Sequence, residues 1–356
     1  MTILWMNFFI VFILAFFARY FAMPVTSEMV MLKPNRLLIL MATTSLVLVS
    51  GFRNNIGDTY FYMHAFTVTD FNWNYIQSSK DVGFSILQMI LKAYTNDPQV
   101  LILITALITN ILIVAVLYKY SRMIELSLYV YIASGMYLVS MNGVRQYLTA
   151  AIIFTATKYI LDGNWKRYFL IVLFASTFHQ SALVLIPIYF VVRRKAWSTI
   201  TFILLFIAVL IVIGFNQFAE IFFATIGDTQ YGHYKDFQEG GANILRVAVD
   251  AIPLILAYIG RHKLREIFPE SDYIVNMALL GLVFMIISTQ NWIFARFSIY
   301  FGLYHLILIS WVIKLFIEKD QKLIYYAVII CYFIYFVYEH IITLGIVYKS
   351  SFWGYI

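Results

Sequence analysis

Residues 99–118 have the sequence QVLILITALITNILIVAVLY, a stretch of 20 residues without a formal charge. A helix of about 20 mostly apolar residues is long enough to cross the hydrocarbon core of a bilayer. Similar stretches recur along the chain and predict about ten spans, at residues 2–22, 37–52, 99–118, 124–141, 145–161, 198–217, 244–260, 273–289, 293–314 and 323–347. We therefore expect an all-α polytopic membrane protein, formed as a single integral membrane domain over residues 1–356.

The composition excludes a water-soluble protein. Hydrophobic residues make up 62% of the chain and charged residues 12%, whereas soluble domains have about 45–50% apolar and about 25% charged residues. A cytosolic enzyme, a nucleic-acid-binding protein and a secreted disulfide scaffold are therefore excluded, the last also because the chain has a single cysteine. The net charge of +7 comes from basic clusters between the spans, which indicates orientation in the membrane rather than a polyanionic partner.

The basic clusters predict how the chain crosses the membrane, because Lys and Arg are enriched in cytoplasmic loops. Placing these clusters inside puts both termini outside the cytoplasm, together with the two long polar loops, 53–81 and 218–243. Basic clusters flank residues 168–192 on both sides, so we expect a short helical hairpin there that turns at residues 177–180. The stretch 82–94 is short and amphipathic, which favours an interfacial or re-entrant helix.

Four arginines fall at the outer ends of predicted spans, against the usual bias of basic residues; they are Arg53, Arg145, Arg246 and Arg296. A guanidinium group binds phosphate oxygens through two parallel hydrogen bonds and stays charged when it is partly buried. The arginines are either separate anchors on lipid phosphates or one site for an anionic ligand reached from outside. As a set, they favour a site for a pyrophosphate-bearing ligand.

Two polar segments accompany these arginines. The segment 51–60 contains Asp58 and is either a loop that contacts phosphate or an ordinary polar turn. Asn142 and Gln146 flank Arg145 at the start of a predicted span, where free N–H groups favour an anion. A polar helix cap is the alternative for that segment. Both segments are candidates for substrate binding.

His179 lies in the expected hairpin turn and is the candidate general base, because histidine exchanges protons near neutral pH. An imidazole that only packs inside the bundle is the alternative. In the loop 218–243, His233 and Tyr234 suit a sugar chain, and a solvated loop with incidental aromatic residues fits them equally well. The sequence contains no HExxH or CxxC motif, so it predicts neither a metal site nor a cofactor.

Several ordered segments resemble the EpsG family of Wzy-like polysaccharide polymerases; they are RNNIGDTY at 53–60, NGVRQY at 142–147, GNWKRY at 163–168, FHQSAL at 178–183 and FARFSIYF at 294–301. The similarity extends over nearly the whole chain and looks closest to the members encoded in Bacillus biofilm-matrix operons. It implies a plasma-membrane enzyme that joins oligosaccharide repeat units carried on undecaprenyl pyrophosphate, outside the cytoplasm. The fold would resemble that of multi-spanning lipid-linked glycosyltransferases, and Tyr300 would join the substrate-binding residues.

The resemblance and the arginines together imply a mechanism. Arg145, Arg246 and Arg296 would hold the pyrophosphate and stabilise the charge of the leaving group, while His179 would take the proton of the acceptor hydroxyl. Displacement at C1 would invert the anomeric configuration without a metal ion. The partners would be a lipid-linked donor and acceptor, the membrane, and the chain-length regulator and flippase of the same pathway, with no nucleic acid.

Two other functions fit the same composition: a flippase that moves the lipid-linked oligosaccharide, and a membrane O-acyltransferase that modifies the polysaccharide. The sequence has no repeated halves, which argues against a transporter. An acyltransferase would need a histidine beside an acyl-donor site nearer the cytoplasm. Lengthening of a lipid-linked oligosaccharide by the purified protein would separate a polymerase from a flippase.

Overall fold

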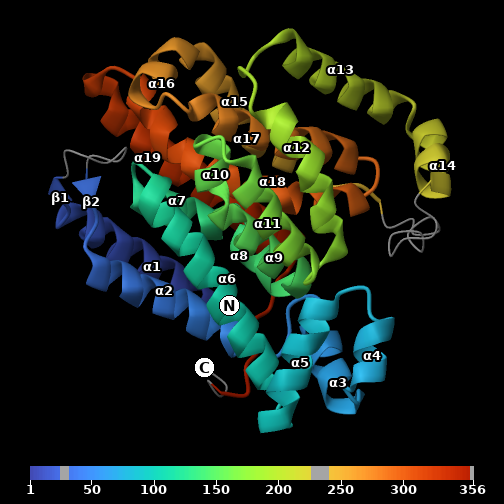
Figure 1. Ribbon diagram of the computed structural model, residues 1–356. Coiled ribbons are helices and arrows are strands. Elements are labelled where there is room, and N and C mark those ends of the chain that lie inside the picture. The colour runs from blue at the N-terminus through green and yellow to red at the C-terminus, as the bar shows by residue number, and fades with distance from the viewer. Residues whose placement is uncertain (25–31, 226–239, 353–356) are drawn as a thin grey trace. The chain divides into compact units, whose positions relative to one another are not determined.

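The computed structural model describes residues 1–24, 32–225 and 240–352, and nearly all of its regular structure is helical (Figure 1). The chain forms two compact units. Unit 1 contains residues 1–189 and 309–356, and unit 2 contains residues 190–308. That both units belong to one integral membrane domain stays a prediction.

Unit 1 contains most of the helices and one short antiparallel strand pair. Its elements are α1 (Thr2–Tyr20), β1 (Met23–Pro24), β2 (Leu32–Lys33), α2 (Arg36–Gly51), α3 (Thr59–Val68), α4 (Trp73–Ser78), α5 (Val82–Tyr94), α6 (Gln99–Tyr120), α7 (Ile124–Ala133), α8 (Met136–Asn142), α9 (Val144–Thr155), α10 (Thr157–Leu161), α11 (Trp165–Ser176), η1 (Gln180–Val184), most of α12 (Leu185–Val192), η3 (Ile313–Leu315), α19 (Glu318–Phe336) and η4 (Val337–Thr343). Within this unit, α3, α4 and α5 form a small group beside α6 (Figure 1).

Helix α6 organises unit 1, because it packs against both α2 and α9. Its buried side chains are mostly apolar, but Asn110 is fully buried and accepts a hydrogen bond from the Tyr131 hydroxyl at 3.2 Å. The buried Tyr137 hydroxyl donates to the Leu46 carbonyl oxygen of α2 at 2.6 Å. Buried polar groups need such partners, so these bonds fix the helices in one register.

The predicted span 124–141 is a bent pair of helices. Helices α7 and α8 meet at an angle of 55°, and Gly135 lies at the bend with φ of +86°. A Cβ atom at this position would lie 2.2 Å from Cε1 of His340, a residue of η4. Glycine is therefore required at the bend, because other residues strain the left-handed conformation and a side chain has no room.

The predicted hairpin at residues 168–192 is present. Helix α11 ends at Ser176, and η1 begins at Gln180 and continues into α12. The Tyr168 and Tyr189 rings lie 5.0 Å apart between their centroids, and the Tyr168 hydroxyl donates to the Leu185 carbonyl oxygen at 3.4 Å. These contacts pair the two arms and leave His179 in the turn.

Unit 2 packs around α17. Its elements are the end of α12, α13 (Thr199–Ile213), α14 (Phe215–Thr225), α15 (Ile244–Ile259), α16 (Arg261–Ile267), α17 (Ser271–Ser288) and most of α18 (Ile293–Val312). Helix α17 contacts both α13 and α15. The buried Asn276 amide on α17 donates to the carbonyl oxygens of Val192 and Arg194, at 2.9 and 2.7 Å. This amide thereby joins α17 to the end of α12 and to the residues that follow it.

The helices confirm an all-α polytopic membrane protein. Among the described residues, five helices have the length and composition of a membrane span, and the number rises to seven if each bent pair is one span. The five are α1, α6, α17, α18 with η3, and α19 with η4. Helices α2 and α15 have 16 residues each. A total of about ten spans stays a prediction.

Three predicted boundaries differ from the structure. The span 145–161 is broken at Ala156 into α9 and α10. The hydroxyls of Thr155 and Thr157 each bond to a carbonyl oxygen three residues earlier, and such bonds bend helices. The loop 53–81 contains α3 and α4, and the first residues of the loop 218–243 belong to α14. The predicted amphipathic helix 82–94 is present as α5.

Replacing Gly135 with Ala should destabilise the protein by about 1–3 kcal/mol, because the new residue adopts a left-handed φ and its Cβ meets His340. The melting temperature of the purified protein in detergent measures this. Gly214→Ala is the matched control, because its nearest neighbour would be at an ordinary contact distance of 3.5 Å. Equal melting temperatures for the two variants would contradict this account of the bend.

Candidate active site

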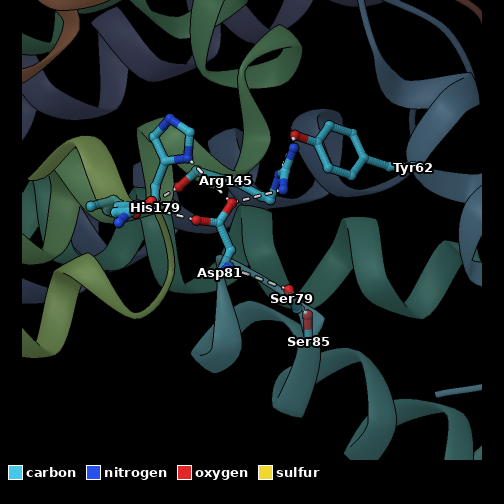
Figure 2. A network of polar contacts seen from close by, with 8 residues as sticks. Tyr62, Ser79, Asp81, Ser85, Arg145 and His179 are labelled. Carbon is cyan, nitrogen blue, oxygen red and sulfur yellow. Dashed lines mark hydrogen bonds and ion pairs between the residues drawn. The ribbon is translucent and has the colours of Figure 1, made fainter. Parts of the chain in front are cut away.

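A buried carboxylate joins three distant segments of unit 1. The Asp81 side chain is 3% exposed, and its Oδ2 accepts a hydrogen bond from Nη1 of Arg145 at 2.7 Å. Nδ1 of His179 lies 3.4 Å from the same oxygen, and the backbone N–H of Gln180 donates to Oδ1 at 3.1 Å. Figure 2 shows Asp81 between Arg145 and His179. The carboxylate thus connects the start of α5, the start of α9 and the hairpin turn.

The backbone fixes this arrangement at the start of α5. The N–H of Gly83 donates to the carbonyl oxygen of Thr177 at 2.7 Å. A Cβ atom at Gly83 would lie 2.3 Å from Oγ1 of Thr177, so only glycine allows the two segments to approach this closely. The backbone of His179 is extended directly after this contact. The contact between Gly83 and Thr177 therefore fixes the hairpin turn beside Asp81, and this positions the His179 imidazole.

Asp81 is ionised at neutral pH. Burial by itself would raise its pKa, but the hydrogen bond and charge of His179, the Arg145 guanidinium and the Gln180 N–H lower the pKa below its ordinary value. A carboxylate at this position favours the imidazole tautomer whose Nδ1 carries the proton and donates to Oδ2. Nε2 of His179 is then the proton acceptor, as in a base that a carboxylate orients.

Arg145 has further partners on the side away from His179. Its Nε donates to the Tyr62 hydroxyl at 3.2 Å, and its guanidinium carbon lies 5.8 Å from the Tyr62 ring centroid and 5.9 Å from that of Phe84. Within the described part of the chain, Nη2 has no hydrogen-bond partner. Because 40% of the side chain is exposed, the guanidinium remains able to bind an anion.

The segment 51–60 lies against the start of α9. Gly57 has φ of +55°, and a Cβ atom there would lie 2.0 Å from Oδ1 of Asn142. The same oxygen accepts a hydrogen bond from the backbone N–H of Asp58 at 2.9 Å. The segment 51–60 and the segment around Asn142, two separate candidates in the sequence, are therefore in direct contact. This contact places Asp58 close to Arg145.

Arg53 holds this segment in place. Its side chain is buried and donates to the Thr59 hydroxyl at 2.9 Å, to the Met141 carbonyl oxygen at 2.6 Å and to the Ser50 carbonyl oxygen. These bonds join the end of α2, the start of α3 and the end of α8. Arg53 thus orders the segment 51–60, and direct contact between Arg53 and phosphate stays a prediction.

A cavity of ≈ 320 Å³ lies beside Arg145. It is open on one side and is lined by residues of α3, α4, α5 and α9 and the segments that precede them: Asp58, Phe61, Tyr62, Ala65, Tyr75, Ser79, Phe84, Ser85, Gln88 and Arg145. Aromatic rings and short polar side chains both contribute to this wall. The arrangement offers apolar faces and hydrogen-bonding groups next to one cation, as binding sites for small polar ligands do.

A model of the EpsG family matches residues 36–355, which is nearly the whole chain and includes every residue of the network and the cavity. The protein belongs to the EpsG family. Membership implies a membrane enzyme that acts like an exopolysaccharide polymerase. Comparisons with curated proteins and with solved structures gave no match. A closer likeness to the Bacillus members stays a prediction.

The other predicted site residues of this EpsG-family protein are not part of the hydrogen-bonded network described for unit 1, or they lie outside the described residues. Gln146 is buried on α9. Arg246 on α15, and Arg296 and Tyr300 on α18, belong to unit 2, so the grouping of the four arginines stays a prediction. His233 and Tyr234 are outside the described residues. Among the described residues, no cluster of three or more His, Cys, Asp or Glu side chains is arranged to hold a metal ion, and metal independence stays a prediction.

The residue at the centre of this candidate site was not predicted from the sequence. Asp81 is the last residue of the predicted loop 53–81, and no pattern in the sequence assigned it a role of its own. A usable signal was its position directly before the amphipathic helix, on the same predicted side of the membrane as Arg145. The sequence also contains no signal for three residues of the cavity wall, which are Tyr62, Ser85 and Gln88. They come close together only when α3 packs beside α5.

The ion pair of Asp81 predicts a pH dependence of stability. Since its pKa is lowered in the folded protein, the stabilisation is complete above the ordinary value of 3.8 and is lost as the pH falls through the folded-state pKa. The melting temperature in detergent should therefore fall more steeply below about pH 4 in the wild type than in Asp81→Asn.

Asp70→Asn, at an exposed position, should follow the wild type. Parallel curves for the wild type and Asp81→Asn would show that the charge of Asp81 contributes nothing to folding.

Proposed function

We propose that this protein polymerises lipid-linked oligosaccharide repeat units at the outer face of the plasma membrane. It would transfer the glycan from undecaprenyl pyrophosphate to a hydroxyl group of an acceptor repeat unit. The observation that carries the proposal is the Arg145–Asp81–His179 network in a chain of the EpsG family. This network supplies a phosphate-binding cation and an oriented base within one hydrogen-bonded group.

The reaction needs one proton transfer and one displacement. The acceptor oxygen bonds to C1 of the donor sugar, the bond from C1 to the pyrophosphate oxygen breaks, and undecaprenyl pyrophosphate leaves with the electron pair. Nε2 of His179 takes the proton of the acceptor hydroxyl. Asp81 holds the imidazole in the required tautomer and stabilises the imidazolium that forms. A single displacement of this kind inverts the configuration at C1.

Arg145 would stabilise the leaving group. One of its terminal nitrogens is bound by Asp81, and Nη2 has no protein partner among the described residues. Charge develops on the pyrophosphate oxygen as the C1–O bond breaks, and a fixed guanidinium nearby lowers the energy of that state. Arg246 and Arg296 would complete the pyrophosphate site, and His233, Tyr234 and Tyr300 would contact the glycan.

The location of the network supports an outer-face site. The topology predicted from basic clusters puts the loop 53–81, the start of the span 145–161 and the hairpin turn on the same side. Asp81, Arg145 and His179 come from these three segments and lie within hydrogen-bonding range of one another. A flipped lipid-linked donor presents its pyrophosphate on that side, where the acceptor, the chain-length regulator and the flippase of the pathway would also meet the enzyme.

Arg145→Lys should reduce the rate of chain growth by about 100-fold or more, because a single ammonium group cannot replace the planar guanidinium on the leaving group. The measurement is elongation of a lipid-linked oligosaccharide by the protein in proteoliposomes. Arg167→Lys, at an exposed position, is the matched control and should keep full activity. Full activity of Arg145→Lys would reject the pyrophosphate assignment, and absence of chain growth by the wild type would reject the polymerase itself.

His179→Gln should lower kcat by about 100-fold or more and remove the acid limb of the pH–rate profile, because glutamine has the hydrogen bonds of imidazole without its basicity. His64→Gln is the control, because His64 is exposed on α3 and lies outside the network. If His179→Gln kept both the rate and the profile of the wild type, His179 would be a packing residue.

A further inference from the structure

The wall of the cavity beside Arg145 includes a buried side-chain amide. Gln88 lies on α5, is 6% exposed and forms part of the cavity wall. Within the part of the chain that the structure describes, its side chain has no hydrogen-bond partner. A buried amide is unfavourable unless its donors and acceptor are satisfied. The Gln88 amide therefore offers a donor and an acceptor to a polar ligand in the cavity.

The rest of the wall has the chemistry that recognises a sugar ring. Four aromatic residues contribute to it, from α3, α4 and α5: Phe61, Tyr62, Tyr75 and Phe84. Aromatic rings provide flat apolar faces, and the tyrosine hydroxyls can also form hydrogen bonds. The Ser85 hydroxyl donates to Oγ of Ser79 at 2.8 Å and can still accept a bond. Oγ of Ser79 also accepts from the Asp81 N–H at 3.3 Å, so the Ser79 hydroxyl can still donate a bond. A pyranose presents both an apolar C–H face and hydroxyl groups.

The size of the cavity suits one sugar. Its volume of ≈ 320 Å³ is near the lower end of the range of about 300–1,000 Å³ for small-ligand sites. This is room for a sugar ring and too little for a polyprenyl chain. Helix α5 is also fixed against the end of α3, because Nζ of Lys92 donates to the carbonyl oxygens of Phe66, Thr67 and Thr69. The cavity is therefore preformed.

We infer that the cavity binds the pyranose attached directly to the pyrophosphate of the donor, with Gln88 as a specificity-determining residue. The inference rests on the proposed function, in which Arg145 contacts the pyrophosphate. Because Arg145 also lines the cavity, the sugar bonded to that pyrophosphate lies next to it. The Gln88 amide then pairs with a hydroxyl or acetamido group of this sugar, and the tyrosine and phenylalanine rings cover its faces.

The test compares the binding of short-chain probes to the full-length protein in detergent. The probes are farnesyl pyrophosphate and farnesyl-pyrophosphoryl derivatives of glucose, galactose, N-acetylglucosamine and N-acetylgalactosamine, and the dissociation constants are measured by microscale thermophoresis. At least one sugar should tighten binding about tenfold over farnesyl pyrophosphate, as one or two buried hydrogen bonds do. Gln88→Met should lose most of this gain and leave the affinity for farnesyl pyrophosphate unchanged.

Gln77→Met is the matched control, because Gln77 is exposed on α4 and is not part of the cavity wall. It should keep the full gain from the sugar, while Arg145→Lys should weaken binding of every probe. The inference is overturned if none of the sugars tightens binding, or if Gln88→Met keeps the gain. These measurements need no chain growth, so a wild type that binds the sugar without elongating it would disprove the polymerase and leave the sugar site intact.

Discussion

The site depends on the charge of one buried carboxylate. A carboxylate removed from water requires a cation and hydrogen-bond donors, and Asp81 obtains them from Arg145, His179 and the Gln180 N–H. These partners come from segments up to 99 residues apart in the chain. The carboxylate therefore sets the relative position of the Arg145 guanidinium and the His179 imidazole, and the close backbone contact at Gly83 maintains it.

Patterns of hydropathy and charge along the sequence predicted individual helices and one helical hairpin. The uncharged run 99–118 became α6, and the amphipathic stretch 82–94 became α5 with the same boundaries. The hairpin followed from basic clusters on both sides of 168–192, because a single crossing would have put one cluster on the wrong side. In each case hydropathy, charge or length is a property of neighbouring residues, which is why the sequence alone was sufficient.

Long-range contacts were not predictable in the same way. Arg145 and His179 were recognised because arginine and histidine have distinctive chemistry, but their common partner Asp81 is an ordinary loop residue by sequence. Its importance arises from burial and from contacts across α5, α9 and the hairpin turn. Arg53 is the opposite case, because its residue type and predicted outer position suggested ligand binding. In the structure its guanidinium donates to backbone carbonyl oxygens and to a threonine hydroxyl.

Helix α5 is attached to other segments at both ends. Its first turn is tied to the hairpin through Asp81 and Gly83, and Lys92 in its last turn binds the end of α3. Its 13 residues thus form a helix about 20 Å long that joins the hairpin turn to the end of α3. Inserting or deleting one residue between Gly83 and Gln88 would turn the later part of the helix by about 100° and carry Gln88 out of the cavity wall. The length of this segment is therefore as constrained as its composition.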